Sequence, residues 1–165
     1  MENRTTILFE EEQKFDQRWL WIFLIVVSVV ILAVQFSVFF SSSVEASGFG
    51  FYFSLFNVFL VIGLIWLFSV MKLKTRIDKE KIEVKFYPFV RKEVKWEVIK
   101  KAEVIDYGFV GGWGIRLWTK YGTVYNVKGS KGLFIQTNDN KQFLIGSQRF
   151  EDLENLIKAR KINNI

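Results

Sequence analysis

The chain of 165 residues has no cysteine and no histidine, and only one proline, Pro88. Without cysteine there are no disulfides, no thiol redox chemistry and no cysteine-ligated zinc. Without histidine the chain lacks the usual general base, the commonest metal ligand and the ordinary sensor of mild acid. A hydrolase would then need a serine–lysine or a paired-carboxylate mechanism. The densest acidic groups, at 10–12 and 151–154, are explained by solubility and helix-dipole effects, so we expect no enzyme, cofactor or metal.

Charge is also missing from two long apolar stretches, 19–40 and 49–71. A helix rises about 1.5 Å per residue, so about 20 apolar residues cross a hydrocarbon core of roughly 30 Å. Both stretches reach that length, and the short break between them carries a single charge, Glu45. The sequence therefore predicts a hairpin of two membrane-spanning helices over 19–71.

Two other interpretations of the hairpin are weaker. A buried helix of a soluble protein seldom runs this long without a charge, and here the pattern occurs twice. The second alternative is a cleaved signal peptide, because Val44-Glu45-Ala46 loosely matches the small-x-small pattern of a cleavage site. However, the apolar stretch before that site is too long, and the leading segment is not net positive.

The charges that are present are distributed unevenly. Residues 72–165 hold 20 Lys and Arg against 11 Asp and Glu, a net charge of +9, whereas residues 1–18 carry −2. Orientation follows the Lys and Arg residues near the span ends. These are Lys14 and Arg18 before the first span and Lys72, Lys74 and Arg76 after the second, with none in the turn. We therefore predict that both termini are cytoplasmic, with an N-terminal segment (1–18), the hairpin (19–71) and a basic domain (72–165).

The N-terminal segment is polar and acidic, with a small apolar patch at Ile7-Leu8-Phe9. It could lie on the membrane surface, pair with the basic domain or remain a disordered lead-in. Its composition favours the disordered lead-in.

After residue 71 the hydrophobic pattern changes to a period of two, which is typical of half-buried strands. The predicted strands are 73–77, 82–86, 90–96, 102–108, 115–118, 123–127, 132–137 and 142–145. Apolar residues at helical spacing from Phe150 to Ile157 then predict a C-terminal helix. The expected fold class is an α+β membrane protein, in which a transmembrane hairpin precedes an antiparallel β sandwich or open barrel of seven to eight strands capped by a helix.

Several motifs in this domain resemble those of a known group. Lys95-Trp96-Glu97-Val98-Ile99 resembles the W-x-x-I of bacterial pleckstrin-homology-like (PH-like) domains, which occur beside paired transmembrane helices. Three further motifs resemble a set of uncharacterised bacterial membrane proteins: 111–116 (GGWGIR), 125–129 (YNVKG) and 144–149 (LIGSQR). The resemblance implies a PH-like fold and a place in the bacterial inner membrane, and it implies no particular activity.

The glycine-rich segment 111–114 has two interpretations. Converging backbone N–H groups could bind an anion, but no phosphate-loop motif is present, and a bulge with Trp113 in the core explains the segment as well. Arg116 and Arg149 flank the distinctive motifs, and arginine suits bidentate recognition of phosphate or carboxylate. The candidate ligand-binding residues are therefore Trp113, Arg116 and Arg149.

The expected partner is the anionic leaflet of the membrane. The candidate membrane-surface residues are Lys72, Lys74, Arg76, Lys79 and Lys81. We expect general electrostatic attraction to acidic lipid, in a non-enzymatic binding or scaffolding module. Alternatively, the protein is an accessory subunit of a larger membrane complex, because Asn57 would gain from a helix partner. A protein partner or a homo-oligomer stays possible, whereas nucleic acid is not expected.

Overall fold

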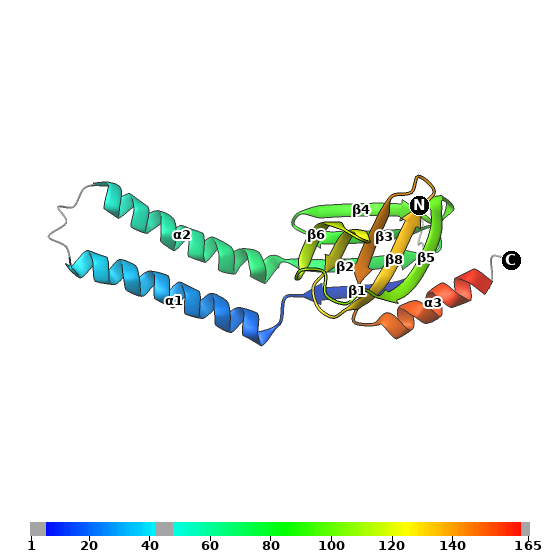
Figure 1. Cartoon of the computed structure of the whole chain (residues 1–165), viewed down its shortest axis with the longest axis horizontal. Helices are drawn as coiled ribbons and strands as arrows, with labels where there is room; N and C mark the ends of the chain where they lie inside the picture. The colour runs from blue at the N-terminus through cyan, green and yellow to red at the C-terminus, as the bar shows by residue number, and fades with distance from the viewer. Residues whose placement is uncertain (1–5, 42–47, 163–165) are drawn as a thin grey trace. The chain divides into compact units, whose positions relative to one another are not determined.

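The computed structural model describes residues 6–41 and 48–162. The chain divides into two compact units. One is a helical unit, Phe15–Val70, and the other is a sheet unit formed by the residues up to Lys14 together with Met71–Ile165. Figure 1 shows the helices and strands of both units.

The helical unit contains α1 (Arg18–Ser41) and α2 (Gly48–Val70). Both helices are long and apolar enough to cross a membrane, and Val61 is the one buried residue within their described apolar stretches. This confirms the two predicted apolar helices. The turn that includes Val44-Glu45-Ala46 lies outside the described residues.

Polar side chains within these helices bond to carbonyls of their own helix. Ser28 Oγ donates to Leu24 O at 2.7 Å, and Asn57 Nδ2 donates to Phe53 O at 2.9 Å. Such bonds satisfy polar groups locally, as an apolar surrounding requires. Because one Asn57 donor is already used, that residue gains less from a helix partner than the sequence suggested.

The sheet unit contains two sheets, and all eight predicted strands are present. The first sheet has the order β1 (Ile7–Lys14), β2 (Lys72–Asp78), β3 (Lys81–Tyr87) and β4 (Val90–Lys95). The second has the order β5 (Ile99–Asp106), β8 (Lys131–Thr137), β9 (Gln142–Gly146), β7 (Gly122–Asn126) and β6 (Gly114–Thr119). All pairs are antiparallel except β7 and β9, which run parallel, contrary to the expected wholly antiparallel arrangement.

The described part of the N-terminal segment contains a strand and is not a disordered lead-in. Residues 7–14 form β1, the edge strand of the first sheet, which pairs antiparallel with β2 from Ile7↔Asp78 to Lys14↔Lys72. Phe9, Glu11 and Gln13 point into the unit and are buried. The second of the three interpretations, pairing with the basic domain, is therefore correct for these residues.

The core lies between the two sheets. Leu73 and Ile77 of β2 and Val84 of β3 are almost wholly buried. Lys92 Nζ, on β4 of the first sheet, lies 3.7 Å from the centre of the Phe143 ring on β9 of the second sheet. This contact identifies the face of the second sheet that is turned towards the first. The opposite face carries a smaller cluster of Tyr107, Val124, Phe134 and Leu144, covered by Val110 and Tyr121.

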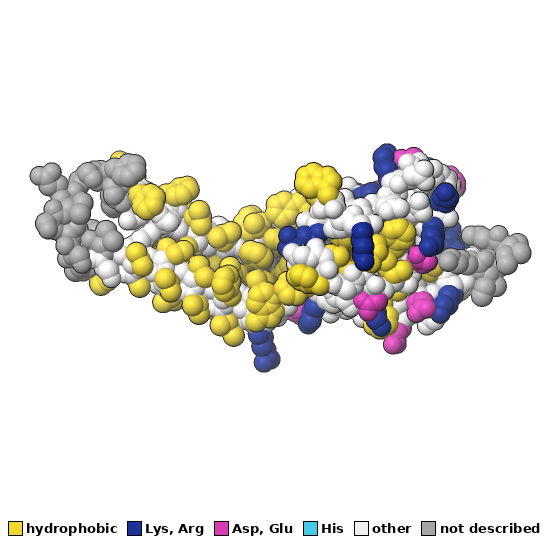
Figure 2. Space-filling model, in the orientation of Figure 1, with side chains coloured by type: hydrophobic (Ala, Val, Ile, Leu, Met, Phe, Trp, Pro, Cys, Tyr) yellow, Lys and Arg dark blue, Asp and Glu magenta, His cyan; other side chains and the backbone are white. Residues whose placement is uncertain are grey.

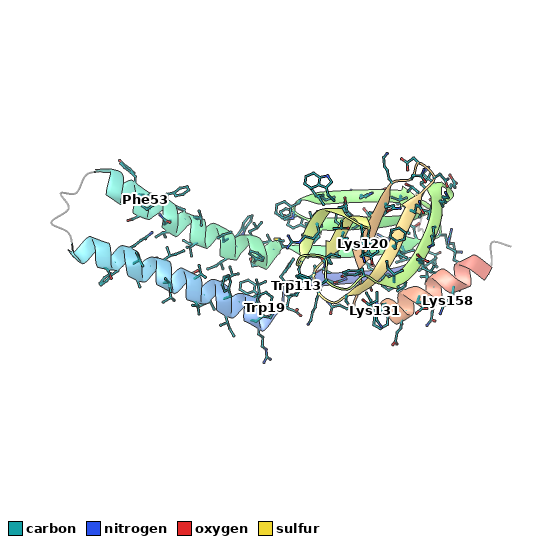
Figure 3. All side chains as sticks on the ribbon, in the orientation of Figure 1. Trp19, Phe53, Trp113, Lys120, Lys131 and Lys158 are labelled. Carbon is teal, nitrogen blue, oxygen red and sulfur yellow. The ribbon has the colours of Figure 1, made fainter. Side chains whose placement is uncertain are left out.

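The C-terminal helix α3 (Phe150–Ile162) packs on β5, β8 and β1. Leu153 and Ile157 are its buried residues, while Glu151 and Asp152 occupy the first turn. The expected closing helix is thus confirmed. Figure 3 labels Lys158 of α3 and Lys131 near the start of this helix, and Lys131 Nζ lies 3.9 Å from the centre of the Phe150 ring.

Candidate functional site

Trp113 is not a core residue. Its side chain keeps 38% of its surface exposed, just before β6 begins, at the place marked in Figure 3. The three glycines around it, Gly111, Gly112 and Gly114, all have positive φ, so the segment is a tight turn that turns the Trp113 side chain away from the core. The prediction that Trp113 packs in the core is wrong.

Arg116 packs against this turn. A Cβ atom on residue 112 would overlap the Arg116 guanidinium, so the glycine leaves room for the arginine. Arg116 Nε is buried and has no hydrogen-bond partner among the described residues. Arg116 therefore supports the glycine turn, and no hydrogen bond or ion pair of the described residues connects it with Arg149.

Arg149 is occupied by contacts within the sheet unit. Its Nε and Nη2 atoms lie 2.8 and 2.7 Å from Asp152 Oδ2. Its Nη1 donates to Glu10 O at 3.1 Å, and its guanidinium lies 5.2 Å from the centre of the Phe9 ring. These contacts hold β1 to the start of α3, and a ligand would have to compete with Asp152 for the guanidinium.

The three distinctive sequence motifs meet around Asn126. Its Nδ2 lies 3.4 Å from both Tyr107 Oη and Gly112 O. A Cβ on Gly146 would lie 2.9 Å from Asn126 Cβ and 3.0 Å from Tyr107 Oη, too close for any side chain. The motifs therefore fix the path of the chain over the small outer cluster, which is a structural role.

A buried polar junction joins β1 to the end of β9. Glu11 accepts hydrogen bonds from Ser147 Oγ at 2.6 Å and from Gln148 N at 2.8 Å. Gln13 Nε2 donates to Gly146 O at 2.8 Å. Glu11 and Gln13 are polar residues on an inward face, and these bonds compensate for their burial.

The predicted membrane-surface residues do not form one cluster. Lys72 and Lys74 lie where β2 begins, Arg76 lies mid-strand, and Lys79 and Lys81 lie in or beside the turn at the far end of β2. A strand rises about 3.3 Å per residue, so the two ends of β2 are about 20 Å apart.

Strand register assembles a different basic group at the beginning of β2. On the outward face, Lys74 lies directly opposite Lys85 of β3, and Lys85 lies directly opposite Arg91 of β4. Opposed side chains on neighbouring strands are about 4.5–5.5 Å apart at Cβ, and like charges in such positions repel. We call these three residues the basic row.

The basic row borders a depression of about 410 Å³ on the surface of the first sheet. It is lined by Lys72, Lys74, Lys85, Tyr87, Pro88, Phe89, Val90 and Arg91. Lys72 lies opposite Tyr87, so the aromatic turn between β3 and β4 lies at the end of the sheet where β2 begins. Figure 2 shows basic and hydrophobic side chains together at this end of the sheet unit.

Carboxylates on the same face hold the cations of the depression. Lys74 Nζ lies 2.6 Å from Glu10, Lys85 Nζ lies 2.9 Å from Glu83, and Arg91 Nε lies 2.8 Å from Glu83. The hydrogen bond between Lys74 and Glu10 lowers the pKa of Glu10 and raises the pKa of Lys74. The pair of Lys74 with Glu10 is exposed and contributes only about 0–1 kcal/mol, so an incoming anion can compete for Lys74. Glu83 is buried, so its bonds hold Lys85 and Arg91 more firmly.

Lys85, Arg91, Tyr87 and Phe89 were missed as site residues in the sequence. The period-two pattern places Lys85 and Arg91 on outward faces, but only the register of β2, β3 and β4 brings them beside Lys74. For the described residues, no group of acidic side chains could hold a metal ion.

Comparison of the chain with protein-family models, curated proteins and solved structures gives no match. The fold itself defines the class: an α+β chain with two long apolar helices, sheets of four and five strands, and a helix packed on the sheets.

Proposed function

We propose that the protein is a membrane-anchored, non-enzymatic binding module of the bacterial inner membrane, with both termini cytoplasmic. In this proposal α1 and α2 span the bilayer, the sheet unit is a PH-like domain, and the depression beside the basic row binds anionic lipid headgroups.

The pairing of β1 with β2 carries the proposal. Lys14 lies opposite Lys72, and these two residues end β1 and begin β2. Lys14 precedes the start of α1 by four residues, and Lys72 follows the end of α2 by two. A chain extends at most about 3.6 Å per residue, so Lys14 lies within about 14 Å and Lys72 within about 7 Å of a helix end. The depression therefore lies within reach of the headgroups of any bilayer that the helices cross.

Charge supports the same ligand. The outward face near the helix attachments carries five cations, Lys14, Lys72 and the basic row. Among the described residues these cations pair with four carboxylates, Glu10, Glu12, Glu83 and Glu93. A lysine or arginine near an anionic leaflet contributes about 1 kcal/mol of attraction, and salt weakens it because exposed charges are screened beyond about 8 Å at physiological ionic strength.

The test uses the full chain in a zwitterionic detergent, titrated with short-chain phosphatidylglycerol or phosphatidylcholine at low and high salt. We expect saturable binding of phosphatidylglycerol that weakens with salt. The double variant Lys85→Gln/Arg91→Gln removes two charges from the row, about 2 kcal/mol, so its affinity should fall about thirtyfold.

The matched control is Lys79→Gln/Lys95→Gln, which removes the same charge away from the depression. If both double variants lose the same affinity for phosphatidylglycerol, the lipid is attracted to the basic domain in general and not to the depression. Equal binding of the two lipids would reject headgroup binding altogether.

A second candidate function is an accessory subunit of a larger membrane complex. It is favoured by the apolar side chains that α1 and α2 leave exposed, which a protein partner could cover as well as lipid. Asn57→Leu should then reduce the partner recovered after gentle extraction, by removing the polar contact that the remaining amide atoms can make, worth below about 1 kcal/mol. Unchanged recovery would count against this candidate.

A further inference from the structure

The sheet unit leaves several large aromatic side chains in contact with solvent. Tyr87 and Phe89 are 53% and 55% exposed, Phe109 is 81% exposed and Trp118 is 94% exposed. We call these four residues the aromatic rim. Buried aromatics supply much of the stability of a fold, whereas these rings contribute little to the core of their own unit.

The aromatic rim lies at the end of the sheet unit that connects to the helices. Tyr87 lies opposite Lys72, and Phe89 follows in the same turn. Gln13, the residue before the end of β1, donates a hydrogen bond to Gly146 O at the end of β9. The end of β7 lies beside the end of β9, and the start of β6 pairs with the end of β7. The loop that holds Phe109 leads into this start of β6. Figure 1 shows β6, which contains Trp118, at the end of the unit where β2 begins.

Trp118 is held in an unusual backbone conformation. Its φ is +54°, and the register of β6 with β7 shifts between Arg116 and Thr119, which marks a bulge. A residue other than glycine is strained in the left-handed region, and such residues are typically found where the conformation serves a site. Here the bulge presents the Trp118 indole almost fully outward.

We propose that the aromatic rim inserts into the interfacial layer of the bilayer that α1 and α2 cross. This inference rests on the proposed function and adds a second, apolar mode of contact with the same lipid. Tryptophan and tyrosine favour the membrane–water interface because they combine an apolar ring with a polar group. Two observations favour lipid over a protein partner: the few residues between the sheet unit and the helices, and the cations of Lys72 and the basic row beside the rings, which match anionic headgroups.

The natural lack of cysteine makes the test direct. Single cysteines replace Phe89, Trp118, Lys79 and Val30 in separate full-length variants, each labelled with the fluorophore NBD and placed in phosphatidylcholine/phosphatidylglycerol nanodiscs. One set of nanodiscs contains lipid with a nitroxide quencher near the headgroup, and a second set carries the quencher near the bilayer centre.

Labels at 89 and 118 should show blue-shifted emission and several-fold stronger quenching by the shallow nitroxide than the label at 79, with little change at high salt. Lys79 is the matched control because it lies exposed in the turn at the far end of β2 and β3. Quenching at 89 and 118 no stronger than at 79 would overturn the inference. A blue shift without lipid quenching would also overturn it, because the rings would then be covered by protein.

Val30, in the middle of α1 and 55% exposed, separates this inference from the proposed function. A label there should be quenched by the deep nitroxide if α1 spans the bilayer. Without that quenching the membrane anchor itself fails. With it, and without quenching at 89 and 118, only the insertion of the aromatic rim fails.

Discussion

Glu11 is a buried carboxylate whose two oxygens both accept hydrogen bonds from the segment after β9. Glu11→Gln replaces one acceptor by a donor that faces Gln148 N or Ser147 Oγ. We expect a loss of about 1–3 kcal/mol, measured as a lower midpoint of denaturation of the full chain in detergent. Glu12→Gln is the neighbouring control, because Glu12 is exposed and its ion pairs with Lys72 and Lys14 contribute below about 1 kcal/mol. Equal effects would show that the buried junction adds no stability.

Gly146 is restricted by space. Gly146→Ala places a methyl group against Asn126 and Tyr107, and overpacking of this kind costs about 1–3 kcal/mol. Gly63→Ala is the control, because a Cβ there has nothing within 4 Å and alanine suits a helix better than glycine. Both variants are compared by thermal denaturation in the same detergent. A neutral Gly146→Ala would mean that Asn126 moves aside at no cost.

Among the secondary-structure elements, β1 must be included in any fragment that is meant to contain the complete sheet unit. A fragment of residues 71–165 lacks this strand, so the edge of β2 and the side chains beneath Phe9 would be exposed. Replacing Phe15–Met71 by Asn-Gly instead joins the paired residues Lys14 and Lys72 through a two-residue type I′ turn. We expect this joined chain to be monomeric, with a well-dispersed NMR spectrum.

The fragment 71–165 is the control for that experiment, and we expect it to aggregate or to bind dyes that report exposed apolar surface. If it folds as stably as the joined chain, β1 is an accessory strand and the junction at Glu11 is dispensable.

At the scale of the whole molecule, the pairing of β1 with β2 requires that Leu8 and Ser130, both in the sheet unit, lie on the same side of the membrane. Single cysteines at Leu8, Ser43 and Ser130 test this with a membrane-impermeant thiol reagent on intact cells. Ser43 lies in the turn outside the described residues, and the distribution of Lys and Arg predicts that it alone is labelled.

The other labelling patterns have separate meanings. Labelling of Leu8 and Ser130 but not of Ser43 would reverse the predicted orientation and keep the β1–β2 pairing. Different labelling of Leu8 and Ser130 would contradict the pairing itself.

Local periodicity was enough to predict several features of the fold from the amino-acid sequence. Uncharged stretches of about 20 residues predicted α1 and α2, because the length and apolarity of a span are properties of one continuous segment. Alternation with a period of two predicted the strands from β2 to β9, and helical spacing predicted α3. Register does not enter any of these predictions, which is why a single sequence suffices for them.

Features that depend on residues far apart in the chain become visible in the folded structure. The alternation of β1 is hidden because its inward residues Glu11 and Gln13 are polar, and they can be buried only because Ser147, Gln148 and Gly146 bond to them. Likewise, the contact of Arg149 with Glu10 O joins segments that are far apart in the chain, so the sequence does not show it. The basic row exists only through the register of three strands, since charges on separate strands become neighbours when the strands pair.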